Sequence, residues 1–263
     1  MDAPAIKFDF TDKVVVITGG SRGLGHAMAL GFAATGANLA IASRKLDACE
    51  ATATEIRAMG RQASAHSAHV GSWSDCDRLA QEVFARWGRV DVLINNAGMS
   101  PIAPSSLETS EELFDKVIGV NLKGPFRLSA LFGSHMAAGD GGAIINISST
   151  SSIRPTPDTA PYAAAKAGLN KLTIGFAKEY GPKVRVNCIM AGPFHTAISR
   201  GWSRTPEFTR YAHDNFALQR AGEPNEIVGA ALYFASPLAS FTTGTVLIID
   251  GGASHPGSTH APE

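Results

Sequence analysis

The sequence lacks long hydrophobic runs, an excess of charge and paired cysteines. Its 263 residues carry 23 basic and 23 acidic side chains, so the composition gives no electrostatic footprint for nucleic acid or an anionic membrane. No apolar run reaches the roughly 18 residues that a membrane span requires. Cys49, Cys76 and Cys188 have no paired spacing, which favours free thiols over a disulfide or metal site. The first residues, "MDAPAIKFDF", lack the pattern of a secretory signal. We therefore expect a cytoplasmic protein with no metal, no membrane association and no nucleic-acid partner.

Short apolar runs rich in Val and Ile alternate with longer amphipathic stretches. The clearest runs are "KVVVITGG", "NLAIAS", "RVDVLINNAG", "GAIINISS", "KVRVNCIM" and "GTVLIIDGG". Such runs suit strands that are buried on both faces of a parallel sheet. A weaker strand near "RQASAHSAHV" is needed to keep the alternation. The pattern predicts an α/β fold, a doubly wound Rossmann-like parallel sheet of about seven strands with helices on both faces. With 44% apolar residues, the chain fits a single domain over residues 1–263.

Two of the amphipathic stretches show clear helix signals. "GHAMALGFAATG" follows the first strand, and "SDCDRLAQEVFARWG" lies before the fourth. The second of these opens with Ser74 and Asp75 as candidate caps and closes at Gly88. In doubly wound sheets, ligands bind beyond the carboxyl ends of the strands. We therefore expect the functional residues in the segments that directly follow the strands.

A glycine-rich loop, "TGGSRGLG", follows the first strand and opens a helix. Gly19, Gly23 and Gly25 allow a tight turn and a close backbone approach to a pyrophosphate. The helix start adds unpaired N–H groups and a positive dipole end. We expect this loop to hold a dinucleotide through Gly19, Ser21, Arg22, Gly23, Leu24 and Gly25.

The end of the second strand bears on the choice of dinucleotide. An NAD site usually places Asp or Glu there, to accept a hydrogen bond from the ribose 2′-OH. Here the strand ends in Ser43 and Arg44, followed by Lys45, and Arg22 in the glycine loop could approach the same place. A guanidinium suits a 2′-phosphate. We predict NADP(H) in preference to NAD(H); the alternative is that Arg44 and Lys45 lie on a solvated helix start.

The segment "PYAAAKAG" places Tyr162 and Lys166 four residues apart, with three alanines between them. That spacing puts both side chains on one face of a helix. A free tyrosine has a pKa near 10, and a neighbouring ammonium should lower it. The pair could then move a proton to or from a carbonyl or alcohol oxygen. Ser149, beyond a strand end, could donate to an oxygen that gains negative charge, with Ser148 as its rival.

Taken in order, these motifs resemble the short-chain dehydrogenase/reductase family over residues 18–252. The motifs are "TGGSRGLG", "NNAG", "VNLKG", "NISST", Tyr162 with Lys166, "RVNCIMAGPFHT" and "GTVLIIDGG". The resemblance implies that Tyr162 is the proton donor or acceptor and that Lys166 lowers its pKa and bonds the nicotinamide ribose. It also implies that Ser149 bonds the substrate oxygen and that Asn121 holds a water.

The same resemblance implies further cofactor contacts. Asn95 and Gly98 would help to position the cofactor and stabilise the sheet, and Thr196 would meet its carboxamide or phosphates. The full set that the resemblance places around the cofactor includes Asn96, Ala97, Gly98, Tyr162, Lys166, Gly192, Phe194 and Thr196. Two places depart from the family pattern. Ala191-Gly192 stands where the family has Pro-Gly, and His69-Val70 replaces an Asp-Val pair near the adenine.

Residues 194–219 occupy the position of a substrate lid in this family. The segment contains Arg200, Arg204 and Arg210, which suit either a solvated lid or an acidic substrate. Trp202 and Phe208 in the same segment could line a pocket or pack on the core.

The resemblance implies hydride transfer between NADP(H) and a small-molecule carbonyl or alcohol, and we expect a ketone reductase. The substrate is left open among a 3-oxoacyl thioester, a sugar acid, a steroid-like ketone and a small xenobiotic carbonyl. A nucleotide-sugar epimerase would need more chain, and an enoyl reductase has a longer tyrosine-to-lysine spacing. The remaining alternative is a non-catalytic dinucleotide-binding sensor or scaffold. We also expect a homo-oligomer, as a tetramer, with "AGLNKLTIGFAKEY" as a candidate interface.

Overall fold

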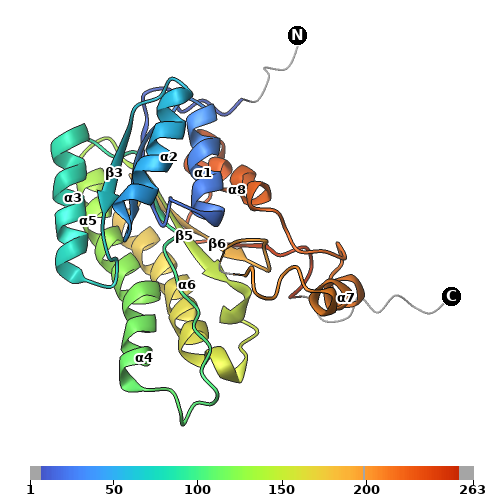
Figure 1. Ribbon diagram of the computed structural model, residues 1–263. Coiled ribbons are helices and arrows are strands. Elements are labelled where there is room, and N and C mark those ends of the chain that lie inside the picture. Colours follow the sequence, from blue (N-terminus) through green and yellow to red (C-terminus); the bar gives the residue numbers. More distant parts are fainter. Residues whose placement is uncertain (1–6, 198, 255–263) are drawn as a thin grey trace.

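A computed structural model describes residues 7–197 and 199–254, which form a layered α/β structure around one sheet (Figure 1). The seven strands run parallel in the order β3-β2-β1-β4-β5-β6-β7. They are β1 (Val14–Thr18), β2 (Asn38–Ser43), β3 (Ala63–Ser67), β4 (Val92–Asn95), β5 (Gly142–Ser149), β6 (Val184–Ala191) and β7 (Val246–Ile249). The strand order reverses between β1 and β4, which is where such sheets bind ligands. The predicted doubly wound parallel sheet is confirmed, including its weak third strand.

Helices cover both faces of the sheet (Figure 1). One core layer joins the sheet to α1 (Gly23–Ala34), α2 (Leu46–Ala58) and α8 (Val228–Ala235). The other joins it to α3 (Trp73–Trp87), α5 (Gly124–Ala138) and α6 (Ala160–Tyr180). These layers form because β1, β2, β4, β5 and β6 are apolar on both faces.

Shorter elements connect the layers. Helix α4 (Glu111–Ile118) continues through a π-helical turn (Gly119–Lys123) into α5, and α7 (Pro206–Asn215) stands apart from the sheet in Figure 1. Single 3₁₀ turns span Thr150–Ser152, Pro157–Thr159, Pro224–Ile227 and Pro237–Ala239. No helix in the described part of the chain is both long enough and apolar enough to cross a bilayer.

The start of α3 differs from the prediction, whereas its end does not. Ser72 is the N-cap, because its hydroxyl accepts from the backbone N–H of Asp75 at 3.3 Å. Ser74 therefore does not cap the helix. The Asp75 carboxylate instead accepts from the backbone N–H of His69 at 2.9 Å. Gly88 ends the helix in the left-handed conformation, with φ of 69°.

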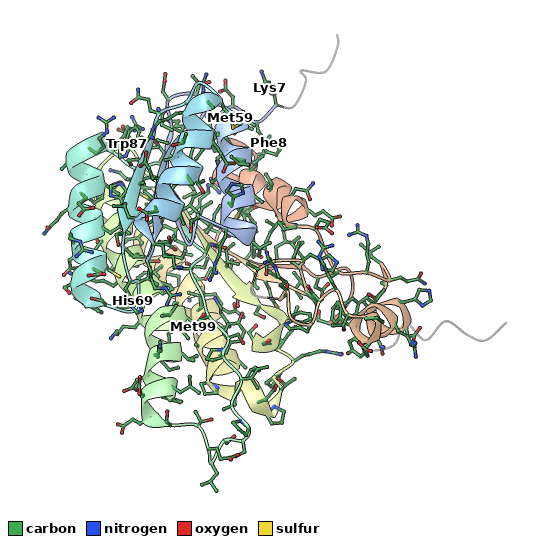
Figure 2. The ribbon with its side chains drawn as sticks, in the orientation of Figure 1. Lys7, Phe8, Met59, His69, Trp87 and Met99 are labelled. Carbon is green, nitrogen blue, oxygen red and sulfur yellow. The ribbon has the colours of Figure 1, made fainter. Side chains whose placement is uncertain are left out.

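The carboxyl ends of the strands can be located in Figure 2 by the labelled residues. In Figure 2, His69 and Met99 lie at the end where the strands finish, whereas Met59 and Trp87 lie at the opposite end. His69 follows β3 and Met99 follows β4, so both belong to the edge where a ligand is expected.

Candidate active site

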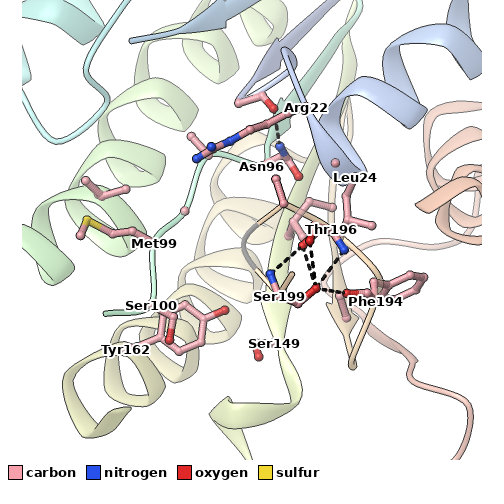
Figure 3. A pocket seen from close by; sticks show the side chains of 18 of the residues that line it. Arg22, Leu24, Asn96, Met99, Ser100, Ser149, Tyr162, Phe194, Thr196 and Ser199 are labelled. Carbon is pink, nitrogen blue, oxygen red and sulfur yellow. Dashed lines mark hydrogen bonds between the residues drawn. The ribbon is translucent and has the colours of Figure 1, made fainter. Parts of the chain in front are cut away.

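A cleft of about 770 Å³ opens along the carboxyl ends of the strands (Figure 3). Every site residue predicted from the sequence lines it except Asn121, Gly25 and Asn95. Those that line it are Gly19, Ser21, Arg22, Gly23, Leu24, Ser43, Arg44, His69, Val70, Asn96, Ala97, Gly98, Ser149, Tyr162, Lys166, Gly192, Phe194 and Thr196. The topology thus brings together residues from seven separate segments of the chain.

The glycine-rich loop forms one end of the cleft. Gly19 and Gly23 have φ of +65° and +56°, a backbone conformation that favours glycine. A Cβ on Gly25 would lie 2.2 Å from the Gly19 carbonyl oxygen, so Gly25 allows α1 to pack against the loop and does not reach the cleft. Its predicted contact with a cofactor is therefore not supported by its position. Arg22 is the N-cap of α1 and its side chain does not cap the helix, so the first-turn N–H groups remain available to an anion.

Cationic side chains gather beside this loop. Arg22, Arg44 and Lys45 all line the cleft and are exposed, and Figure 3 shows Arg22 extending across its mouth. Among the ion pairs of the described residues, none involves these three side chains. Ser21 donates to Ser43 at 3.1 Å, which ties the loop to the end of β2. A phosphate group at this end would meet positive charge without displacing an acidic partner.

Tyr162 and Lys166 lie on the first turns of α6 and both line the cleft. Figure 3 shows the Tyr162 hydroxyl turned into the pocket on the side of Ser149. The Lys166 Nζ donates to the Ile147 carbonyl oxygen at 2.7 Å and lies 5.7 Å from the centre of the Tyr162 ring. The expected juxtaposition of phenol and ammonium is present, although the ammonium hydrogen-bonds to the backbone of β5.

The protonation properties of this pair differ from the prediction. Burial raises the pKa of Tyr162, and the Ser149 hydroxyl only partly opposes that rise. Burial lowers the pKa of Lys166 to about 8. The predicted lowering of the Tyr162 pKa by Lys166 is not seen in this structure, where burial has the largest effect on that pKa and raises it. The phenol is held in its protonated form, as a proton donor must be.

The two candidate serines have different surroundings. Ser148 is buried, and its hydroxyl donates to the Lys166 carbonyl oxygen at 3.2 Å. Ser149 is only partly buried; its hydroxyl donates to the Ser151 hydroxyl at 3.3 Å and accepts from the Ser151 N–H at 3.2 Å. Ser149 is thus the serine whose hydroxyl lies beside Tyr162.

Asn121 lies behind the cleft wall and not on its surface. It is fully buried in the π-helical turn, where its side-chain amide donates to the Met99 and Val117 carbonyl oxygens at 2.9 Å. A Cβ on Gly98 would lie 3.0 Å from Asn121 Oδ1 and 3.6 Å from Lys166 Nζ. Asn121 and Lys166 therefore both face Gly98. The sequence does not reveal the π-helical turn that buries Asn121, because its residues continue an ordinary helical pattern.

The segment after β4 anchors the glycine loop. The Asn96 side-chain amide donates to the Thr18 and Gly19 carbonyl oxygens at 2.9 and 3.1 Å. Asn95 does not line the cleft; its side chain is buried and donates to Ser129 and Asn146 at 2.9 Å. Of the two implied roles of Asn95, its geometry fits the structural one, because it joins β4 to β5 and α5.

Ser199 organises the far end of the cleft and was missed in the sequence. Its hydroxyl donates to the Phe194 carbonyl oxygen at 2.6 Å and accepts from the Thr196 N–H at 2.9 Å (Figure 3). It is buried and lines the cleft together with Thr196. The three-residue spacing of Thr196 and Ser199, which is typical of polar turns, is the signal that could have found it.

The lid segment contributes two aromatic residues to the cleft, Phe194 and Trp202. Trp202 lines it, whereas Phe208 packs edge-on against Trp202 at 4.8 Å. Arg200, Arg204 and Arg210 do not line the cleft, and Arg204 lies 3.7 Å from Glu223. The described residues contain no cluster of three or more His, Cys, Asp or Glu side chains that could hold a metal ion.

The arrangement combines a place for a dinucleotide with a proton donor. The glycine loop, the start of α1 and the cations at the end of β2 could hold phosphate groups. Tyr162 and Ser149, at the other end, could address an oxygen atom.

Comparisons with known proteins agree with this geometry. A family model described as enoyl-(acyl carrier protein) reductase matches residues 19–254. Bovine (Bos taurus) dehydrogenase/reductase SDR family member 4 is 32% identical over 243 residues, covering 92% of this chain and 87% of that protein. The 3beta-hydroxysteroid dehydrogenase 1 of Eggerthella lenta is 37% identical over 254 residues, covering 95% and 97%.

A solved structure from Beutenbergia cavernae is similar throughout. It is described as a "putative NAD(P) dependent gluconate 5-dehydrogenase" and contains NADP at low occupancy. It is 33% identical with a TM-score of 0.89, and the match covers 94% of this chain and 99% of that one.

Proposed function

The chain belongs to the short-chain dehydrogenase/reductase family, and from this premise we propose that it is a ketone reductase that uses NADPH. Membership shows an NAD(P)-dependent oxidoreductase that acts on alcohol or carbonyl groups. The observation that carries the finer proposal is the placement of the Tyr162 hydroxyl and Ser149 in the same cleft as the glycine loop.

Each polar residue at the reacting end has a defined role in this proposal. The Ser149 hydroxyl donates a hydrogen bond to the carbonyl oxygen and holds it beside Tyr162. Bound NADPH would supply the hydride to the carbonyl carbon. Tyr162 gives its phenolic proton to the oxygen as negative charge develops there. Burial raises the pKa of Tyr162, so the phenol is protonated at neutral pH when the step begins.

Lys166 and the residues around it complete the site. We propose that Lys166 bonds the ribose next to the nicotinamide and, when charged, supports proton release from Tyr162. Asn121 positions this part of the wall through its contacts with the Met99 backbone and its approach to Gly98. Thr196, held by Ser199, would contact the carboxamide or the phosphates, and residues 194–219 would form a substrate lid.

The proposed preference for NADP(H) depends on charge at the end of β2. Arg44 and Lys45 stand where an NAD site usually has a carboxylate, and Arg22 lies near them in the same cleft. A guanidinium gives paired, charge-assisted hydrogen bonds to a phosphate. The Michaelis constants for NADPH and NADH test this directly. A clear preference for NADH would contradict the proposal.

Two other functions are less well supported. The matching family model is described as an enoyl reductase, but the four-residue spacing of Tyr162 and Lys166 is shorter than in that class. A non-catalytic sensor would have no need for Tyr162, Lys166 and Ser149 at one end of the cleft. Carbonyl-dependent oxidation of NADPH distinguishes the reductase from the sensor.

The decisive variant is Tyr162→Phe, which removes the hydroxyl and keeps the ring. We expect kcat for carbonyl reduction to fall by about 100-fold or more, with the dissociation constant for NADPH changed little. Fluorescence titration of NADPH measures binding, and absorbance at the reduced nicotinamide band measures turnover. Near wild-type turnover would refute the role of Tyr162.

We further propose that the enzyme is a cytoplasmic homotetramer. Its three cysteines are free and buried, which suits a reducing compartment. Apolar side chains remain exposed on α4–α6 and beside β7, and such surfaces are typical of contacts between subunits.

A further inference from the structure

Charge is distributed unevenly along the cleft. Its exposed cations, Arg22, Arg44 and Lys45, all come from the segments that follow β1 and β2. His69, after β3, belongs to the same half. In the half built from the segments after β4, β5 and β6, the ionisable lining residues are Tyr162 and Lys166, as far as the structure describes the chain.

Neither of these two can serve as a counter-charge for a substrate acid. Tyr162 carries no positive charge, and burial raises its pKa, which keeps it neutral. Lys166 is only 4% exposed and its ammonium already donates to the Ile147 carbonyl oxygen. The lid arginines that made an acidic substrate conceivable do not line the cleft, and Arg204 has an acidic neighbour in Glu223.

The same half of the cleft presents apolar surface to solvent. Ile102, from the segment after β4, is 70% exposed, and Trp202, from the segment after β6, is 43% exposed. Both line the cleft, as does Met99. The uncharged hydroxyl residues Ser151, Thr156 and Thr159 also line this half of the cleft. Exposed apolar side chains from separate segments around a pocket mark a surface that a ligand can cover.

We propose that the substrate is an uncharged carbonyl compound with an apolar skeleton, seated against Ile102 and Trp202. The inference rests on the proposed ketone reductase function and chooses among the substrate classes that the sequence leaves undecided. A carboxylate placed beside Tyr162 would lose water without gaining a cation, which is unfavourable. An apolar skeleton would instead bury the exposed side chains of Ile102 and Trp202. The proposal therefore disfavours sugar acids and other carboxylates.

Matched pairs of substrates test the charge directly. Levulinate, 4-acetylbenzoate and 4-oxocyclohexanecarboxylate are each compared with their methyl esters, with NADPH as the reductant. The acid and the ester of each pair have the same ketone group and the same atoms next to it, so the two compounds differ chiefly in charge. We expect kcat/KM for the esters to exceed that for the acids by at least about tenfold. Acids that are reduced as fast as their esters, or faster, overturn the proposal.

A pair of variants tests the location. Ile102→Lys places a cation in the apolar half, and we expect it to lower the ester-to-acid ratio at least about threefold, since an exposed charge is screened. Leu107→Lys adds the same charge in the same connecting segment, but Leu107 is 95% exposed and does not line the cleft. The control should leave the ratio unchanged. If both variants lowered the ester-to-acid ratio equally, the proposed contact between substrate and Ile102 would be contradicted.

Binding provides a readout that does not depend on turnover. With NADP⁺ present, the esters should quench the fluorescence of Trp202, and this quenching should be absent in Trp202→Phe. Failure of NADPH to bind, or absence of any carbonyl-dependent oxidation, would refute the proposed function itself. Measurable reduction that favours the acids would overturn the present inference alone.

Discussion

Lys166 places an ammonium group in a nearly dry part of the protein. Its pKa falls to about 8 because burial penalises the charged form, while the neighbouring Cys188 opposes the fall only weakly. The difference from the ordinary value of 10.5 corresponds to about 3 kcal/mol of unfavourable burial at neutral pH. A residue kept at such a cost is typical of a functional site.

Lys166→Met should therefore stabilise the cofactor-free protein while it abolishes reduction. Below pH 8 the wild-type lysine is charged in both the folded and unfolded states, so the full burial penalty is present. Between pH 8 and 10.5 the folded state loses its proton first, and wild-type stability rises with pH. We expect the variant to be more stable by up to about 3 kcal/mol at pH 7, and the advantage should shrink as pH rises above 8. Urea unfolding at several pH values measures it.

The matched control is Lys171→Met, on the same helix. Lys171 is exposed, so its replacement should change the free energy of unfolding by less than about 0.5 kcal/mol at any of these pH values. Burial also raises the pKa of Cys76 to about 11 and of Cys188 to about 12. Above pH 9 these thiols make the free energy of unfolding fall as pH rises, which is opposite to the effect of Lys166. Because both proteins contain the thiols, the test compares the free energies of unfolding of variant and wild type at each pH. A Lys166→Met protein less stable than wild type at pH 7 would contradict the prediction.

Arg44 should discriminate between the two cofactors. Removing a guanidinium that bonds a phosphate costs about 1.5–3 kcal/mol. We therefore expect Arg44→Ala to raise the Michaelis constant for NADPH by about 10- to 100-fold and to change that for NADH by less than about threefold. Steady-state kinetics with both cofactors supply the comparison.

Arg86→Ala is a suitable control, since Arg86 lies on α3 beside Trp87 and outside the cleft. It should leave both Michaelis constants unchanged. Equal losses for NADPH and NADH in Arg44→Ala would show that Arg44 has a general role and does not read the 2′-phosphate.

Single residues could be predicted where their type and spacing determine the chemistry. The four-residue spacing of Tyr162 and Lys166 placed both on one helical face, and the glycines of the loop marked the strand-to-helix turn. The pKa of Tyr162 could not be predicted, because it depends on burial by residues far away in the sequence. The burial of Asn121 and the contacts of Ser199 could not be predicted for a similar reason, because the local path of the backbone determines which groups surround these two side chains.

At the scale of elements, helices α5 and α6 pack through a small residue. A Cβ on Gly133 of α5 would lie 2.4 Å from Cε2 of Tyr180 at the end of α6. Tyr180 is buried and stacks on Phe176 at 5.6 Å, so its ring cannot move aside without loss of packing. Overpacking of this kind costs about 1–3 kcal/mol, which outweighs the gain in helix propensity of about 1 kcal/mol.

We expect Gly133→Ala to lower the free energy of unfolding by about 1–2 kcal/mol, the overpacking cost less the gain in helix propensity. Gly175→Ala on α6 is the matched control, because an added Cβ there meets no atom of the described residues within 4 Å. It should stabilise the protein by about 0.5–1 kcal/mol. The two urea midpoints should therefore move in opposite directions. Shifts of the same sign would contradict this account of the α5–α6 contact.

Elements could be predicted where burial leaves a simple pattern. Continuous apolar runs predicted the central strands, and the alternation required β3 even though its sequence, "ASAHS", is polar. The start of α3 was misplaced because Ser72, Ser74 and Asp75 are all acceptable caps. Only the backbone shows which hydroxyl meets a free N–H group.

At the scale of the whole molecule, two of the regions with exposed apolar side chains lie away from the cleft. A groove of about 340 Å³ on α4–α6 is lined by Ile118, Leu122, Lys123, Phe126, Gly168 and Leu172. Beside the edge strand β7, Phe241 is fully exposed, and Leu238 and Leu247 are partly exposed. A closed tetramer with two-fold symmetry needs two different self-complementary interfaces. We propose one interface for each region, and we call the two regions the helix groove and the β7 surface.

If the proposed tetramer forms through these two regions, single substitutions should disrupt its interfaces one at a time. Leu172→Glu buries a charge in the helix groove, and Phe241→Glu does so on the β7 surface, so each variant should give dimers. The double variant should give monomers, and Leu107→Glu, on an exposed side chain outside both regions, should remain a tetramer. Sedimentation velocity at micromolar concentration measures the four masses. A monomeric wild type would contradict the tetramer. If neither single variant formed dimers, the subunits would have to meet elsewhere.

Because Leu172 lies on the same helix as Tyr162 and Lys166, loss of the helix-groove interface should also reduce kcat more than loss of the β7 surface.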